Sequence, residues 1–245
     1  AMFRERLKLA RNREGLSLRC LAARIEGAVS AQAIGKYERG EMMPSSTVSI
    51  ALSKALGVMM GYLLSPSDVS LEGVESRKLA STKARERAMV EGAVLDHVDR
   101  YLQIEELLGI ASAQWEEPEG APYRIRAIED AEQAAEAVRA AWNLGGNPIP
   151  DMTELLEEQG IKVLKLDFPL SVDGLTCDVP RPNGEEVPVV VCTTNKSIER
   201  QRFTLAHELG HMLLKIPAGV KEEKACHRFA GAFLAPKEEL FDEVG

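Results

Sequence analysis

The most constraining feature of this sequence is an apolar stretch, residues 202–214, that carries two histidines and a glutamate. His207 and His211 are four residues apart, which on a helix separates them by about 40° around the axis and about 6 Å along it. Both imidazoles therefore reach the same side of the helix, and Glu208 projects about 100° away from His207. Unpaired histidine and glutamate side chains are costly to bury in an apolar core. This H-E-x-x-H pattern therefore predicts a zinc-type site, with Glu208 beside a metal-bound water and not on the metal.

The composition is that of an ordinary globular protein. With 245 residues the chain is long enough for one to three domains, and its contents of 45% hydrophobic and 28% charged residues are average. No apolar run approaches the roughly 20 residues of a membrane span and no signal peptide opens the chain, so we expect no membrane partner. Four scattered cysteines without a C-x-x-C pair favour free thiols over disulfides, and hence a cytoplasmic protein.

The charge is unevenly distributed along the chain. Residues 1–64 carry ten lysines and arginines against five glutamates, a net charge of +5, whereas the whole chain carries −8. The remaining residues must therefore carry −13. A basic N-terminal part joined to an acidic body predicts one module that binds a polyanion and a second module with another role.

Residues 2–64 are expected to form a domain of five short helices. Ser17 and Ser30 stand where N-caps are expected, because a serine hydroxyl can accept a hydrogen bond from the first turn of a helix. Glycines and Pro44 separate the apolar segments. The expected helices cover residues 3–13, 18–25, 31–38, 44–56 and 59–64.

The segment from Ser17 to Val58 resembles the helix-turn-helix of XRE-type (Cro/C1) regulators. The shared pattern includes Leu21-Ala22, Ile34, Tyr37-Glu38-Arg39-Gly40, Pro44 and a final A-L-G-V. The resemblance implies that residues 2–64 bind double-stranded operator DNA, with the N-terminal turn of the third helix in the major groove. The turn at residues 26–30 is about two residues longer than in the shortest repressors.

This placement of the third helix selects candidate DNA contacts. Contacts at or near base edges are expected from Ser30, Ala31, Gln32 and Lys36. Gln32 suits an adenine edge and Lys36 a guanine or a phosphate, whereas Ala31 offers no hydrogen-bonding side chain. Contacts to the phosphate backbone are expected from Arg39, Arg19 and Arg11. The alternative is a helical dimerisation or docking unit of the same fold whose charges are simply solvated.

Residues 65–122 are expected to connect two domains. The polar residues 65–76 contain glycine and proline and predict a linker, with a short strand at 70–77 left open. Residues 77–109 have the periodicity of one long amphipathic helix, and the acidic residues 115–123 predict a second linker. The long helix can pack on either domain or pair with its copy in a second chain, so we expect a homodimer.

Residues 123–245 are expected to form a zincin-like domain around the H-E-x-x-H helix. The whole chain is therefore expected to be mainly α with a small β-sheet (α+β). The strand Val187–Cys192 is expected at a sheet edge, where an extended substrate can lie. The expected helices cover residues 128–142, 152–159, 198–214 and 221–236, and the expected strands cover 161–168 and the two sides of a turn at 181–186.

H-E-x-x-H supplies two metal ligands, and a catalytic zinc usually takes a third from elsewhere. The next predicted helix offers Glu222, Glu223 and His227. R-F-T-L-A-H-E-L-G-H followed by E-x5-F-A-x3-L-x-P resembles the ImmA/IrrE zinc peptidase family, whose members often carry an XRE-type helix-turn-helix. The resemblance implies that Glu223, six residues before the F-A pair, is the third ligand.

Two alternatives to Glu223 stay open, namely Glu222 and His227. His227 stands where the family commonly has a small polar residue, and it can ligate the metal, orient Glu223 or stabilise an oxyanion. Cys226 is expected to be buried in the core. Residues 237–245 begin a helix without an end signal, and relatives usually continue past this point, so we expect the domain to be incomplete at its C-terminal end.

The resemblance also implies a mechanism and a role. Zn²⁺ held by the two histidines and Glu223 would lower the pKa of its water towards about 7, and Glu208 would take the proton and pass it to the leaving amine. The chain would be a transcription regulator carrying an endopeptidase that cuts a repressor- or antitoxin-like protein, or itself, in response to a signal. Some relatives accompany toxin–antitoxin operons. The alternative is a regulator with a sensory or vestigial metal site, which would not need Glu208.

Overall fold

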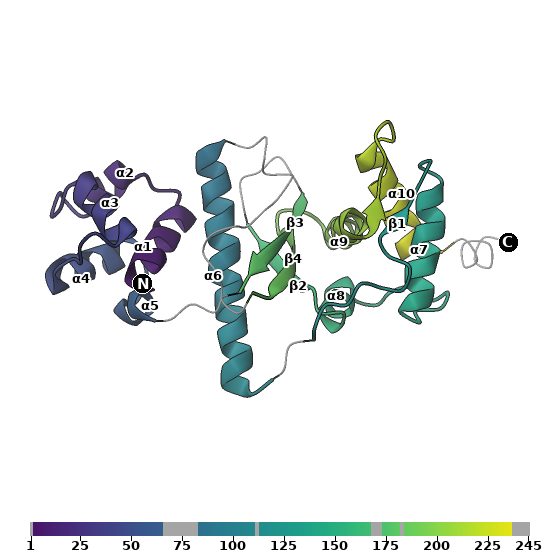
Figure 1. Ribbon diagram of the computed structural model, residues 1–245, viewed down its shortest axis with the longest axis horizontal. Helices are drawn as coiled ribbons and strands as arrows, with labels where there is room; N and C mark the ends of the chain where they lie inside the picture. Colours follow the sequence, from purple (N-terminus) through teal and green to yellow (C-terminus); the bar gives the residue numbers. More distant parts are fainter. Residues whose placement is uncertain (1, 66–82, 111–112, 168–172, 182–183, 237–245) are drawn as a thin grey trace. The chain divides into compact units, whose positions relative to one another are not determined.

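The computed structural model of the protein describes residues 2–65, 83–110, 113–167, 173–181 and 184–236 (Figure 1). Ten helices and two small sheets occur in this part of the chain, which confirms the mainly α (α+β) fold class. By its internal contacts the chain divides into a first unit, residues 1–111 with 179–186, and a second unit, residues 112–178 with 187–245.

Parts of several expected segments lie outside the described residues. They are most of the linker at 65–76 with its candidate strand at 70–77, the start of the long helix at 77–82, residue 168 of the predicted strand, residues 182 and 183 of the predicted hairpin turn, and the tail at 237–245.

The first unit contains the five short helices predicted from the sequence, with ends within two residues of the predicted ones. Ser17, Ser30 and Ser45 each accept a hydrogen bond from a backbone N–H in the first turn of the following helix, which caps it. One fully buried side chain from each helix contributes to a common core: Leu7, Leu21, Ile34, Leu52 and Leu63. The helices are α1 Met2–Arg13, α2 Leu18–Arg24, α3 Ala31–Arg39, α4 Ser46–Ala55 and α5 Met60–Leu64.

A sixth helix of the first unit, α6 (Ala84–Leu108), is held against α1 by buried charged side chains. Arg6 Nη1 lies 2.6 Å from Asp99 Oδ2, and Arg13 Nη1 lies 3.0 Å from Asp96 Oδ2. The two backbones also approach closely, since a Cβ atom on Gly92 would lie 2.8 Å from the amide nitrogen of Arg13. The long helix expected between two domains thus belongs to the same unit as the five short helices.

The second unit combines helices with most of a three-stranded sheet in which β2 pairs with β4 and β4 pairs with β3; by the contact division, the last two residues of β3 and the first of β4 are counted with the first unit. Strand β2 runs parallel to β4, with Lys162 opposite Val189. Two further short strands, β1 and β5, pair in parallel next to the end of α9. The elements are β1 Tyr123–Arg124, α7 Asp130–Ala141, α8 Met152–Glu158, β2 Lys162–Leu166, β3 Gly174–Pro180, β4 Glu186–Thr193, α9 Ile198–Leu213, β5 Leu214–Lys215 and α10 Glu222–Leu234.

The expectation that Val187–Cys192 forms a sheet edge is wrong. These residues belong to β4, which lies between β2 and β3. Every residue of β4 except the first is buried. A continuous apolar run is typical of a strand covered on both faces, whereas a strand with one face in solvent alternates apolar and polar residues. Among the described strands, β2 and β3 form the edges of this sheet.

Candidate metal centre

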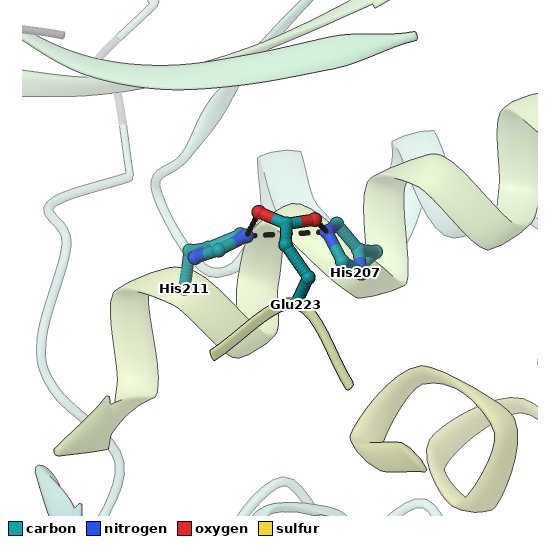
Figure 2. A group of neighbouring side chains, drawn as sticks. All are labelled: His207, His211 and Glu223. Atoms are coloured by element: carbon teal, nitrogen blue, oxygen red, sulfur yellow. Dashed lines mark hydrogen bonds and ion pairs between the residues drawn. The ribbon is translucent and has the colours of Figure 1, made fainter. Parts of the chain in front are cut away.

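Three side chains from two helices converge at one point of the second unit (Figure 2). His207 and His211 come from α9, and Glu223 comes from the first turn of α10. The two Nε2 atoms are 3.1 Å apart. The Glu223 carboxylate reaches both rings, with Oε2 lying 3.2 Å from His207 Nε2 and Oε1 lying 3.4 Å from His211 Nε2. One ligand atom from each residue lies within 4.8 Å of the others.

The spacing of these atoms fits a tetrahedral zinc ion. Zinc binds histidine nitrogen and carboxylate oxygen at about 2.0–2.2 Å, which places neighbouring ligand atoms of a tetrahedron about 3.3 Å apart. The two Nε2 atoms are 3.1 Å apart, and each of them lies 3.2 or 3.4 Å from a different oxygen of the Glu223 carboxylate, so all three separations are close to that edge length. Two imidazoles and one carboxylate also leave a fourth position for water, as catalytic zinc sites do.

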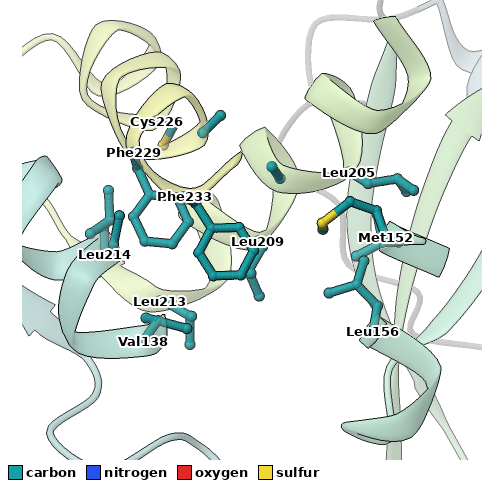
Figure 3. Packing of buried hydrophobic residues seen from close by; sticks show 14 of the residues in the cluster. Val138, Met152, Leu156, Leu205, Leu209, Leu213, Leu214, Cys226, Phe229 and Phe233 are labelled. Atoms are coloured by element: carbon teal, nitrogen blue, oxygen red, sulfur yellow. The ribbon is translucent and has the colours of Figure 1, made fainter. Parts of the chain in front are cut away.

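Close packing of α9 against α10 brings the three ligands together. Leu209 of α9 lies beside Phe233 of α10 in the buried core of this unit (Figure 3). Gly210, inside the H-E-x-x-H motif, faces α10, since a Cβ atom there would lie 3.1 Å from Phe229 Cδ1 and 3.4 Å from Cys226 Cα. A Cβ atom there would require the Phe229 ring to give way by a few tenths of an ångström, so glycine favours the close approach of the two helices that carry the ligands. The sequence-based prediction missed this role, although an isolated glycine inside a helical pattern is a recognised sign of close packing.

The other candidate ligands occupy different positions. Oε1 of Glu222 lies 3.1 Å from Nδ1 of His211, which is not the ring nitrogen that faces the cluster. His227 is exposed and packs edge-on against His207, with 4.7 Å between the ring centroids. Cys226 is fully buried. Within the described residues, the structure thus groups Glu223 with the two histidines.

Glu208 follows His207 on α9 and is buried, with 1% of its surface exposed. The first residue of strand β3 lies against it, because a Cβ atom on Gly174 would lie 3.3 Å from Cγ of Glu208. The same Cβ would lie 2.8 Å from the carbonyl oxygen of Val191, so only glycine allows this approach. Glu208 therefore lies between the metal-ligand helix and an edge strand of the sheet.

The residues expected to contact DNA lie on and around α3 of the first unit. Ser30 caps α3 by accepting a hydrogen bond from the amide of Ala33, and Ala31 is its first residue. The side chains of Gln32, Lys36, Arg39 and Arg19 are exposed. Arg39 donates hydrogen bonds to Glu41, and Gly40 ends the helix with a left-handed backbone at φ 72°.

Arg11, expected at the phosphate backbone, is engaged within the fold. Its Nε and Nη2 atoms donate to Glu38 at 2.6 and 2.8 Å, and its Nη1 donates to the carbonyl of Leu16 at 2.7 Å. The Arg11 side chain is largely buried. This bidentate pair ties α1 to the end of α3, which gives the guanidinium a structural task within the fold.

Comparison with known families finds a different match for the N-terminal and the C-terminal part of the chain. Residues 7–63 match the helix-turn-helix family, and residues 156–244 match the IrrE N-terminal-like domain family of M78 peptidases. The chain joins an XRE-type helix-turn-helix domain to an ImmA/IrrE-family domain. No curated protein and no solved structure matches it.

These two matches add coarse functional information. The helix-turn-helix domain makes DNA a partner of the protein. The M78 peptidases are generally zinc-dependent, and the donor set of the ImmA/IrrE-family domain fits that metal. Among the described residues, the helices are too short or too polar to cross a membrane.

Proposed function

We propose that this chain is a transcription regulator whose ImmA/IrrE-family domain is a zinc-dependent endopeptidase. It hydrolyses a repressor- or antitoxin-like protein, or the chain itself, in response to a signal. The observation that carries the proposal is the buried Glu208 directly after the first histidine of a three-ligand cluster. A carboxyl group is costly to bury, so its presence here calls for a role. A site that only sensed zinc would need the three ligands but not this acid, whereas a peptidase needs it as a proton carrier.

His207, His211 and Glu223 would hold the zinc ion, which would supply Lewis-acid chemistry by activating water and polarising the peptide carbonyl. Glu208 then acts twice as a proton carrier. Its carboxylate takes a proton from the attacking water and returns it to the amine that leaves when the peptide bond breaks. The burial of Glu208 keeps its carboxylate away from bulk water.

The substrate in this proposal is an extended polypeptide segment that pairs with β3. Among the described strands β3 is an edge of the sheet, and a Cβ atom on its first residue, Gly174, would lie 3.3 Å from Cγ of Glu208. A segment added to a sheet edge gains main-chain hydrogen bonds regardless of its sequence. Pairing at β3 would place a peptide bond next to the proposed proton carrier, which the interior strand β4 cannot do.

The test of this function combines metal loading with a cleavage assay. The purified chain is stripped with a chelator, reloaded with zinc, and incubated with the repressor- and antitoxin-like proteins encoded beside its gene. Intact-mass spectrometry then detects cuts in these proteins or in the chain itself. We expect cuts only in the zinc-loaded samples. Tight zinc binding without any cut would favour the sensory alternative.

The DNA-binding half is tested through α3. Replacing Gln32 and Lys36 together by alanine is expected to weaken operator binding by about 2–4 kcal/mol, since a specific base contact contributes about 1–3 kcal/mol. A lost phosphate contact would also reduce, by about one, the slope of the logarithm of the binding constant against the logarithm of the salt concentration. Fluorescence anisotropy with DNA from upstream of the gene, at several salt concentrations, measures both quantities.

A matched control for this experiment is Lys54→Ala. Lys54 is an exposed lysine in the last turn of α4, so its loss changes the net charge as Lys36→Ala does. We expect operator affinity to change little in this variant. Equal losses for Lys36→Ala and Lys54→Ala would mean that general charge, and not the surface of α3, governs binding.

In our proposal a homodimer binds two half-sites that lie one helical turn of DNA apart. A footprint on the operator would reveal this spacing.

A further inference from the structure

Two neighbouring acids at the start of α10 contact opposite nitrogens of one imidazole ring. Glu223 Oε1 lies 3.4 Å from Nε2 of His211, whereas Glu222 Oε1 lies 3.1 Å from its Nδ1. The sequence offered Glu222 and Glu223 as rival ligands. We infer instead that Glu222 is a positioning residue that holds His211 in the tautomer and orientation needed for metal binding. This inference rests on the proposed zinc site.

The contact between Glu222 and His211 favours one tautomer of the imidazole ring. An ionised carboxylate can only accept hydrogen bonds, so the contact with Glu222 places the ring proton on Nδ1 of His211. The lone pair of a neutral imidazole is then on Nε2, the atom that faces His207 and Glu223. Metal-binding histidines commonly donate their second N–H to a carboxylate in this way, which fixes the ring and raises the basicity of the ligating nitrogen.

The two histidines differ in how their rings are held. His207 lies one turn deeper in α9, where the ring of Phe203 stacks on it at a centroid distance of 6.4 Å and the ring of His227 packs edge-on. His211 lies in the last turn of α9, next to the start of α10. Aromatic packing thus contributes to the orientation of His207, and a hydrogen bond from the neighbouring helix contributes to the orientation of His211.

A competing explanation is that Glu222 only stabilises α10. It lies in the first turn of that helix, where any negative charge interacts favourably with the helix dipole. The two roles make different demands on the side chain. Stabilisation through the dipole needs a negative charge, so aspartate could replace Glu222 in that role. Positioning of His211 needs a hydrogen-bond acceptor that reaches Nδ1, so glutamine could replace Glu222 in that role.

The experiment measures zinc affinity by competition with a chromophoric chelator, using the full chain and three variants. We expect Glu222→Ala to weaken zinc binding by about 10-fold, the low end of the usual 10- to 100-fold effect, because the Glu222 side chain is 51% exposed. Glu222→Gln should restore most of the affinity, and Glu222→Asp should not, since its side chain is one methylene shorter. Glu199→Ala is the control, as it removes an exposed first-turn acid from α9.

A second readout follows the proton itself. The chain has four histidines, so long-range ¹H–¹⁵N spectra of the zinc-loaded protein can resolve each ring. We expect a protected Nδ1–H on His211 in the wild type and in Glu222→Gln, and its loss in Glu222→Ala. Equal zinc affinity in wild type and Glu222→Ala, or full rescue by aspartate with none by glutamine, would overturn the inference. A wild-type chain that bound no zinc would instead refute the proposed function itself.

Discussion

Replacing Glu208 by glutamine is expected to abolish cleavage while zinc binding stays within a few-fold of the wild type. Glutamine has nearly the same shape as glutamate, so the buried side chain can remain where it is, packed against Gly174. Glutamine cannot accept the proton of the attacking water, and loss of general acid–base catalysis costs about 100- to 10,000-fold in rate. The single-turnover rate on the substrate found by mass spectrometry measures the effect.

The matched comparison for this prediction is Glu223→Gln. Glu223 contacts the ring nitrogens of both histidines and is 66% exposed, whereas Glu208 is buried. Removing the charge of Glu223 should weaken zinc binding, and excess zinc should recover part of the activity. Excess zinc should not rescue Glu208→Gln. Cleavage that persists in zinc-loaded Glu208→Gln would remove Glu208 as the proton carrier and leave the mechanism without a base.

The sequence was sufficient to predict features that depend on local spacing. His207 and His211 are four residues apart on one helix, so their convergence follows from helix geometry alone. The capping serines Ser17 and Ser30 act on backbone amides within three residues and were predictable for the same reason. Glu223 was placed with the histidines by family resemblance, and the structure brings their ligand atoms together.

Features that depend on contacts between distant segments were not predictable in this way. The central position of β4 depends on which strands pair, and its apolar run allowed either an edge or an interior strand. Arg11 was expected at the DNA backbone from its position alone, and its pairing with Glu38, 27 residues away in the sequence, was not foreseen. Glu222 and Glu223 are adjacent acids with the same local surroundings, and only the placement of α10 against α9 gives them different partners.

The first unit offers the second large expected effect, at the ion pair between Arg6 and Asp99. Both side chains are 1% exposed, and the two charged atoms are 2.6 Å apart. Asp99 also accepts a hydrogen bond from Gln103 at 2.7 Å. Removing one partner of a buried pair leaves the other charge without compensation and typically costs about 3–5 kcal/mol. We therefore expect Asp99→Asn to lower the free energy of unfolding of this unit by that amount.

Hydrogen exchange of the α1 and α6 amides in the full chain measures this effect directly, because it reports the opening free energy of each helix separately from the second unit. Replacing both partners, by Arg6→Met with Asp99→Leu, should cost much less than Asp99→Asn alone, since no buried charge is left over.

Glu5→Gln is the control, because the Arg4–Glu5 pair is exposed and such pairs contribute less than about 1 kcal/mol. If Asp99→Asn changed the exchange of α1 no more than Glu5→Gln, the pair would not hold α6 on α1. In that case the apolar contacts of the helix interface, with the close approach at Gly92, would have to supply the stability of the unit.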